Sequence, residues 1–412
     1  MTRYLASKKF GVLALGVLWA MAFSPDASAQ TVITTLAQLR AMSGNGNYVL
    51  GADINASATQ TPGQEFQPIG TQGTPFTGTF SGAVFQDKPK YKISNLKINS
   101  SGQATGLFGY ASGAQISYIA LDNVSVTGLH QTGGLVGVAT NTVITKVGVT
   151  GAVTGAAGGP WVGVGMIVGW AYGWTELYNC WAVGTVSGPI EQGGGLVGGA
   201  LGNSVGGINR VRLISTFSNV TLSSTVSSQF TSTIKLGGII GVGQGVEIQD
   251  ASSVGSVTAR EPAYVGGIAG DLTRPNTGLP RWVLFRALTR SVVTATGSAS
   301  PRAGTIGHHD GNNEGICASI WDTADTGAPR SDSTACQTGF STAQLQAPTQ
   351  VVGVFSRGGN ISCPLQETEA CGPMHSAYPG GSDGRWEDTI WNYNSATEHT
   401  TLKKIPNSVQ PK

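Results

Sequence analysis

The stretch Thr132–Gly155, TGGLVGVATNTVITKVGVTGAVTG, decides the fold. Its core, GGLVG, places glycines on both sides of two apolar residues, Leu135 and Val136, and the Val- and Thr-rich segment that follows is typical of β-strands. Glycine inside a strand costs stability, so its repeated use needs a structural reason. We expect the glycines to serve corners with positive φ and strands squeezed by a neighbouring wall, and the apolar pair to fill an interior.

Further copies of this core recur along the chain, 28 to 43 residues apart, and a β-type segment punctuated by Gly, Asn or Ser follows each of the first six. Each unit therefore holds about three short strands, and no unit can bury its apolar face alone, so the units must stack. The sequence predicts an all-β fold, a parallel β-helix (solenoid) with one turn per unit, and a β-sandwich or propeller is the alternative. The cores are Gly106–Gly109, Gly134–Gly137, Met166–Gly169, Gly195–Gly198, Gly238–Gly241, Gly267–Gly270 and a degenerate copy, Gly304–Gly307.

The composition agrees with a packed protein of low charge. Of the 412 residues, 61 are glycine and 40% are hydrophobic, while only 11% are charged, which favours a buried core over disorder. The formal net charge is +2, and without residues 1–29 the basic and acidic side chains balance. Nothing in this balance points to nucleic acid or to an anionic membrane as a partner.

The N-terminus reads as a signal peptide over residues 1–29. A basic start, MTRYLASKK, precedes an apolar run, Phe10–Phe23, and Ala27–Ala29 fits the small-x-small cleavage rule. We therefore expect a mature protein from Gln30 that is exported to the extracellular space or the outer cell surface, with the periplasm as a further possibility, in a manner typical of Gram-negative bacteria. An uncleaved membrane anchor is the alternative, although the apolar run is short for a span.

The ordered series of cores resembles the GLUG-motif repeats of bacterial surface adhesins, of haemagglutinin-like proteins and of the non-catalytic part of some IgA-cleaving metallopeptidases. The resemblance implies a right-handed β-helical module with an N-terminal cap, exported or displayed on the cell surface, with adhesion as the usual assignment and no reaction. The preference for right-handed crossovers agrees with that hand. Segments outside the cores that share the resemblance are Ile33–Asn55, Phe66–Gly70, Phe76–Gly82, Tyr91–Ile98, Ile320–Gly327, Gly339–Gln346 and Trp386–Asn394.

The peptidase activity of multidomain relatives is not carried over to this chain. An H-E-x-x-H helix supplies two zinc ligands and a general base, and none of the five histidines is followed by glutamate. These histidines are His130, His308, His309, His375 and His399.

We divide the chain into a cap with the first coils, residues 30–105, a repeat region, residues 106–314, and a closing segment, residues 315–412. A short helix is expected around Thr35–Met42. Four late cysteines in an exported chain predict disulfides, with three possible pairings, of which proximity favours neighbours in sequence. Cys180 is left over and is interpreted as a small buried apolar residue. The late cysteines are Cys317, Cys336, Cys363 and Cys371.

A cluster of aromatic residues is the first candidate ligand site. Exposed aromatic rings can stack on sugars, although aromatic rings in a β-helix also stack between turns as ordinary packing. We name this cluster as the candidate contact for a glycan or a surface protein of a host or neighbouring cell. Its members are Trp161, Trp170, Tyr172, Trp174 and Trp181.

The segment HHDGNNEG, His308–Gly315, is the candidate metal site. His308, His309, Asp310 and Glu314 could ligate a metal ion or act in acid–base chemistry, and oxygen ligands at alternate positions would suit Ca²⁺. The loop lacks the full calcium-binding pattern, so a polar turn is the competing interpretation. No other cofactor is expected.

The carboxylates of the repeat region are scattered, and we interpret them as solvated surface groups without a catalytic pair. We therefore expect a non-enzymatic, adhesin-like binding or structural protein. The alternatives are a polysaccharide lyase or hydrolase on a β-helix, which needs clustered carboxylates, and an architectural component of a surface or fibre. The carboxylates in question are Glu176, Glu191, Glu247, Asp250, Glu261 and Asp271.

Overall fold

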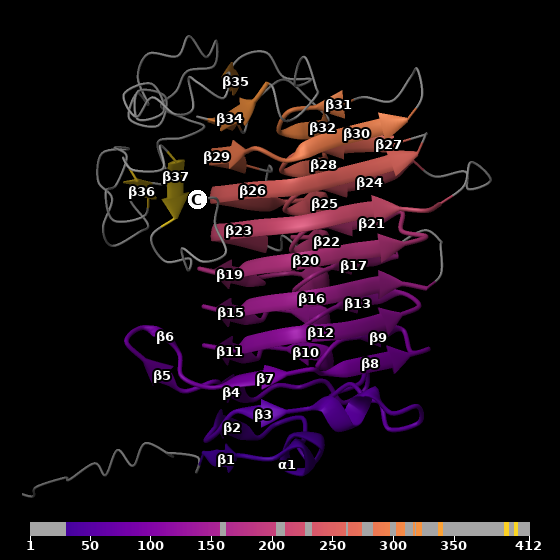
Figure 1. Ribbon diagram of the computed structural model, residues 1–412, viewed down its shortest axis with the longest axis vertical. Helices are drawn as coiled ribbons and strands as arrows, with labels where there is room; N and C mark the ends of the chain where they lie inside the picture. Colours follow the sequence, from indigo (N-terminus) through magenta and orange to yellow (C-terminus); the bar gives the residue numbers. More distant parts are fainter. Residues whose placement is uncertain are drawn as a thin grey trace, which may run out of the picture.

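The computed structural model is a stack of β-coils that climbs from the N-terminal strands to the strands that end near residue 340 (Figure 1). It describes residues 30–156, 162–202, 211–226, 233–260, 263–273, 283–296, 302–309, 316–317, 319–323, 337–340, 391–394 and 399–402. The predicted signal peptide and the side chains of the four late cysteines lie outside the described residues. No helix in these ranges is long and apolar enough to cross a membrane.

The chain enters the stack through a short cap. Helix α1 (Leu36–Arg40) falls where the sequence predicts a helix, and Thr35 caps it together with Gln38 in a capping box. Phe66, Phe76 and Phe80 fill the interior above it. The strands here are β1 (Thr31–Ile33), β2 (Asn47–Leu50), β3 (Ile54–Asn55), β4 (Thr79–Ser81), β5 (Val84–Phe85), β6 (Lys88–Pro89), β7 (Lys92–Ser94) and β8 (Lys97–Ser100), with a 3-10 turn at Ser57–Gln60.

Seven coils follow, and the seven predicted cores lie in register along one wall, which confirms the stacked parallel architecture. Each described coil contributes one strand to a sheet that we call the β14 sheet, namely β10 (Phe108–Ser112), β14 (Val136–Thr140), β18 (Val168–Tyr172), β22 (Val197–Leu201), β25 (Ile240–Gln244), β28 (Ala269–Thr273) and β32 (Ile306–His309). Each also contributes one to the β13 sheet, namely β9 (Ala104–Thr105), β13 (Gln131–Gly133), β17 (Gly163–Gly165), β21 (Gln192–Gly194), β24 (Ile234–Gly237), β27 (Ala263–Gly266) and β31 (Arg302–Ala303). The right-handed sense of the coil stays a prediction.

The rest of each coil forms a third sheet with two arms. The arms meet at a residue with left-handed φ, such as Tyr118 or Lys146, and five of the described coils hold four strands rather than the expected three. The strands are β11 (Gln115–Ser117), β12 (Ala120–Gly128), β15 (Val143–Thr145), β16 (Gly148–Gly155), β19 (Glu176–Tyr178), β20 (Trp181–Gly188), β23 (Val211–Ser224), β26 (Val246–Arg260), β29 (Val283–Thr289), β30 (Val292–Thr296), β33 (Ile316–Cys317), β34 (Ser319–Asp322) and β35 (Gln337–Phe340). Two further strands, β36 (Trp391–Asn394) and β37 (His399–Leu402), pair with each other in antiparallel fashion.

The apolar pair of each core points inward at a bend of the chain. Leu135 and Val136 are both fully buried in the main core, because the chain turns between β13 and β14 and does not alternate like a straight strand. The same core also holds Cys180, as expected for a small buried apolar residue.

The core glycines allow neighbouring strands to pack closely, and the expectation of positive φ at these positions is wrong. The core glycines have no left-handed φ, but a Cβ added to Gly169 would lie 2.5 Å from the backbone nitrogen of Thr132. At Gly241 an added Cβ would lie 2.6 Å from the nitrogen of Gly193. The glycines therefore let the β14 sheet press directly against the backbone of the β13 sheet.

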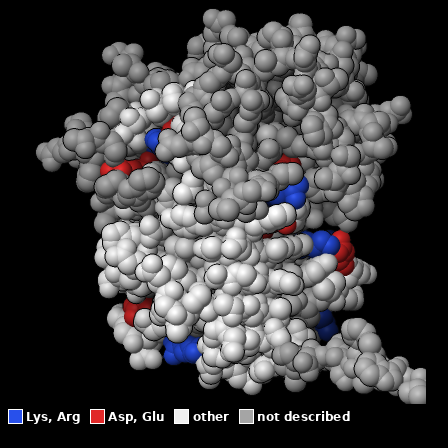
Figure 2. Space-filling view, turned by 180° about the vertical axis from the view of Figure 1, so that it is seen from behind, with Lys and Arg blue, Asp and Glu red and all other residues white. Residues whose placement is uncertain are grey.

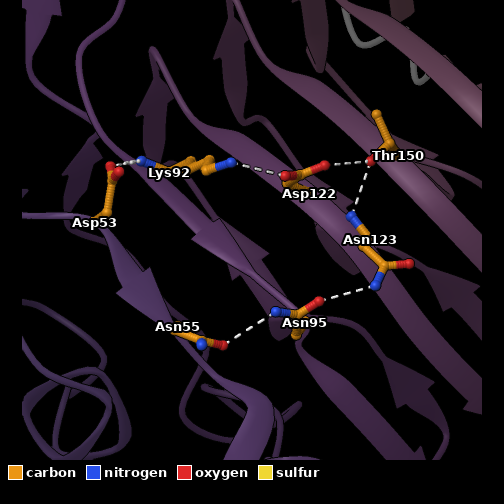
Figure 3. Close-up of polar contacts among 7 residues, drawn as sticks. All are labelled: Asp53, Asn55, Lys92, Asn95, Asp122, Asn123 and Thr150. Carbon is orange, nitrogen blue, oxygen red and sulfur yellow. Dashed lines mark hydrogen bonds and ion pairs between the residues drawn. The ribbon is translucent and has the colours of Figure 1, made fainter.

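Polar ladders tie the first coils together on the outside (Figure 3). Asn95 donates to the side-chain oxygen of Asn55 at 3.1 Å, and Asn123 donates to that of Asn95 at 2.8 Å. Asn95 and Asn123 both adopt the left-handed conformation that asparagine tolerates. A second ladder beside it runs through Asp53, Lys92, Asp122 and Thr150.

In the view from behind, the charged side chains of the described residues form small separate groups among uncharged ones (Figure 2). This agrees with the low charged fraction of the sequence. Buried charged side chains are therefore unusual in this protein and are candidates for a structural or functional role.

Candidate functional site

A cavity of about 500 Å³ lies where the β14 sheet and the β13 sheet meet, outside the main core. Its walls are formed mainly by side chains of these two sheets, together with two residues that directly precede β21 and β24. The lining residues are Trp170, Tyr172, Glu191, Gln192, Ala200, Leu201, Thr233, Lys235, Val242, Gln244, Tyr264, Asp271 and His308.

The parallel register builds one wall as a column. The residue directly after the second core glycine occupies the same place in every coil, so Trp170, Gly199, Val242, Asp271 and His308 stack in order. Four steps of about 4.8 Å give a column about 19 Å long. Its side chains change from apolar at the Trp170 end to charged at the His308 end.

The charged end is an ordered network. Both oxygens of Asp271 are engaged, since Nδ1 of His308 lies 2.7 Å from Oδ1 and the ammonium of Lys235 lies 2.8 Å from Oδ2. The ring of Tyr264 stacks on the imidazole, with centroids 4.3 Å apart and planes 12° apart. The carboxylate fixes Nδ1 as the nitrogen that donates to it, which leaves Nε2 as the nitrogen for another partner.

Two acceptors in the wall have no donor among the described residues. Glu191 is only 2% exposed, and among the described residues no group donates to its Oε1 or to Oε1 of Gln192. A buried carboxylate oxygen without a donor costs free energy, so this part of the wall calls for a water molecule or a ligand that can donate.

The apolar end is formed by stacked rings. Trp170 and Tyr172 lie 5.6 Å apart with an interplanar angle of 24°, and the indole also covers Gly199 of the next coil. Trp170 belongs to a small apolar cluster with Ala104, Val138 and Val242 that is separate from the main core. Burial raises the pKa of Tyr172, with a smaller contribution from Tyr110, so the phenol is neutral and can donate.

The structure thus brings two separately predicted sites to one cavity. Trp170 and Tyr172, expected to contact a ligand, line it together with His308, expected to bind a metal ion. Trp174 is 47% exposed in the turn between β18 and β19, where its indole donates to Glu176 of β19 at 2.6 Å. Trp181 lies over Gly148 on the two-armed sheet. Trp161 lies outside the described residues.

The residues of the cavity do not fit a metal ion. Asp271 has both oxygens engaged, and no three His, Cys, Asp or Glu side chains in the part of the chain that the structure describes are placed to hold one. His309 follows at the next position of β32, opposite Leu272. Asp310 and Glu314, the other members of the predicted metal site, lie outside the described residues.

The interpretation of the carboxylates as solvated groups is wrong for five of the six. Glu176, Glu191, Glu247, Asp250 and Asp271 are buried. Glu261 lies outside the described residues.

Partners for these carboxylates do recur in neighbouring coils. Arg212 of β23 lies 3.2 Å from carboxylate oxygens of both Glu176 and Glu247. Arg286 donates to both oxygens of Asp250 at 2.6 and 2.7 Å. These bridges join one coil to the next on the two-armed sheet, so they stabilise the stack and do not form a cleft.

Sequence reasoning missed Lys235 and Tyr264 and misjudged Glu191 and Asp271. A signal for part of the site was present, because Asp271 and His308 each follow the second glycine of a core, as Trp170 does. Reading that single position along all seven cores would have placed these three side chains in one column.

Comparisons with known proteins point to a class of protein. Residues 27–151 match the family model of the M26 IgA1-specific metallo-endopeptidase N-terminal region. Halomucin from Haloquadratum walsbyi is 41% identical over 117 residues, which are 26% of this chain and about 1% of the length of that protein.

Two solved structures share the fold. An immunoglobulin A1 protease candidate from Bacteroides ovatus aligns over 92% of this chain and 94% of its own, with 16% identity and a TM-score of 0.54. A structure described as IgA1 protease aligns over 77% of this chain and 24% of its own, with 21% identity and a TM-score of 0.56.

These findings correct the expected function. The matched family model describes the N-terminal region of a metallo-endopeptidase, so this match points to a protease-related protein. The prediction that the protein is an adhesin is therefore wrong, and so is the prediction that it is not an enzyme. The matches do not show a GLUG-repeat family, whereas export of the chain agrees with them.

Proposed function

We propose that this chain is an exported, β-helical part of an IgA1-protease-like metallo-endopeptidase, and that it holds the protein substrate for cleavage. The observation that carries the proposal is the match of residues 27–151 to the N-terminal region of that peptidase family. A substrate-holding role suits this chain, since the sequence contains no H-E-x-x-H motif and we assign no zinc ligands to it.

The fold supports such a role physically. A stack of coils joined by continuous parallel ladders is a rigid support, and rigid supports position binding groups better than loops do. The cavity offers buried polar groups and aromatic rings within one concave site, which is the usual composition of a binding pocket. The proposed substrate is a protein of the immunoglobulin A1 class.

Three finer assignments belong to this proposal. The repeats are of GLUG type and occupy residues 106–314, between a cap at 30–105 and a closing segment at 315–412. The late cysteines pair within that closing segment. The protein acts outside the cytoplasm of a Gram-negative cell.

The test uses the full chain, secreted from its host and purified. Its binding to immunoglobulin A1 and to immunoglobulin G is measured by biolayer interferometry, and heavy-chain integrity is followed on gels with zinc and with a chelator. We expect at least tenfold tighter binding of immunoglobulin A1. Equal or absent binding of both antibodies would overturn the proposal, and cleavage by this chain alone that the chelator abolishes would contradict a role confined to holding the substrate.

A further inference from the structure

We propose that the cavity binds a cationic side chain, an arginine guanidinium or a lysine ammonium, seated against the carboxylate of Glu191. That this side chain belongs to a protein substrate rests on the function proposed above, whereas the preference for a cation follows from the cavity itself.

The first step is the charge balance of the walls. The charge of Asp271 is offset by the ammonium of Lys235 at 2.8 Å. Glu191 has no such partner, because no described lysine or arginine forms an ion pair with it and its Oε1 has no described donor. The cavity wall therefore holds two carboxylates, Asp271 and Glu191, and one described ammonium, which is paired with Asp271.

The second step is the supply of acceptors. Oε1 of Gln192, next to Glu191 in the chain, is also buried without a described donor. A guanidinium has five N–H donors in a planar fork and can serve a carboxylate and a neighbouring amide oxygen together. A neutral hydroxyl group would satisfy the hydrogen bonds but would leave the charge of Glu191 without compensation.

The third step is the aromatic lining. Trp170, Tyr172 and Tyr264 border the cavity, and the faces of aromatic rings attract cations, more strongly where water is excluded. A volume of about 500 Å³ accommodates a long side chain together with the backbone that carries it. Charge, acceptors and rings thus favour the same ligand chemistry.

The test compares small probes on the full chain by isothermal titration calorimetry. The probes are N-acetyl-arginine methylamide, its neutral isostere N-acetyl-citrulline methylamide, the lysine analogue, and maltotriose as a neutral sugar. We expect the arginine probe to bind at least tenfold more tightly than the citrulline probe, with maltotriose weaker than either cation. Equal binding of arginine and citrulline, or a preference for maltotriose, would overturn the proposal.

Variants locate the binding. Glu191→Gln keeps the shape of the side chain and removes its charge, so we expect it to abolish the preference for arginine over citrulline. Asp122→Asn is the matched control, a carboxylate that pairs with a lysine on the outer ladder, and it should leave the preference unchanged. If Glu191→Gln fails to fold, Gln192→Leu at the partly exposed neighbouring position should weaken arginine binding at least threefold, and an unchanged affinity would contradict the proposal.

The same variants separate this proposal from the proposed function. If the protein discriminates arginine from citrulline but does not bind immunoglobulin A1, the proposed cation site is supported and the proposed function is overturned. If the wild type and the Glu191→Gln variant bind immunoglobulin A1 equally well and the wild type does not discriminate the probes, the proposed cation site is overturned. The proposed function is then still supported.

Discussion

Single glycines decide how closely the two inner sheets approach each other. At Gly241 an added Cβ would lie 2.5 Å from the carbonyl oxygen of Gly198 and 2.6 Å from the nitrogen of Gly193, both backbone atoms of the preceding coil. We expect Gly241→Ala to lower the free energy of unfolding by about 1–3 kcal/mol, as overpacking of a dense interior does. Thermal unfolding followed by circular dichroism measures the effect.

Gly73 provides the control for this substitution. No atom lies within 4 Å of a Cβ added there, and its φ is not in the left-handed region. Gly73→Ala should therefore change the stability by less than about 0.5 kcal/mol, or raise it slightly because the unfolded chain loses freedom. Equal losses for both variants would show that close sheet packing is not the reason for the core glycines.

Tyr178 makes stability sensitive to high pH. Burial raises the pKa of Tyr178 to about 12, and the carboxylates of Glu176 and Glu247 add to this, while Arg212 acts in the opposite direction. A folded-state pKa above the usual value near 10 means that the neutral phenol favours the folded state. This contribution is present below pH of about 10 and is lost as the pH rises toward about 12.

Tyr178→Phe tests this pH dependence, because phenylalanine cannot ionise. The midpoint of thermal unfolding should fall less steeply between pH 10 and 12 in the variant than in the wild type. The same slope in both proteins would contradict the assignment.

For a single residue, the sequence shows the type of side chain but not which other residues surround it. Leu135 and Val136 could be predicted to fill the interior, but strict alternation would have exposed one of them, and only the bend between two sheets explains why both are buried. Glu191 and Asp271 look like ordinary surface carboxylates in the sequence. Asp271 contacts Lys235 of the preceding coil and His308 of the following coil, and no local pattern encodes such contacts between coils.

Between neighbouring strands, buried charge pairs link one coil to the next. Asp250 of β26 and Arg286 of β29 form a bidentate pair in which both side chains are almost completely buried. Breaking a buried charge pair by removing one partner is strongly destabilising, so we expect Arg286→Gln to cost about 3–5 kcal/mol. Chemical denaturation of the single variants measures this loss.

A double variant isolates the coupling between the two strands. Asp250→Asn together with Arg286→Gln removes both charges, so it should be less destabilising than the sum of the single variants. Asparagine also tolerates the left-handed backbone at position 250. Additive losses would mean that the two charges act independently of each other.

The stacking of the coils could be predicted from the sequence, while the division of each coil into strands could not. Seven spaced cores indicate seven turns that need one another to bury their apolar faces. The segment after each core is divided into two arms at one residue with left-handed φ, such as Tyr118 with φ of +54°. A tyrosine in a β-type run gives no sign of a corner, because its usual conformation is extended.

For the molecule as a whole, the described coils touch mainly the coils directly before and after them, as the parallel pairings between consecutive units show. Such a protein behaves as a one-dimensional array in which stability is the sum of terms within coils and between neighbours. A defect in one coil should therefore weaken that coil and its neighbours, and its effect should fade with distance along the stack. This separates a chain of coupled coils from a single cooperative globule.

Hydrogen exchange read out by mass spectrometry distinguishes these two cases in the Gly241→Ala protein. We expect faster exchange in β21 to β30, the strands of the altered coil and its two neighbours, and exchange close to that of the wild type in β3 and β7 near the N-terminus. In the Gly73→Ala protein the pattern should stay that of the wild type in every coil. A uniform acceleration from β1 to β32 would mean that the stack unfolds as one unit. In that case the shape of the cavity, which spans several coils, would depend on the stability of the whole molecule and not only on the coils that line it.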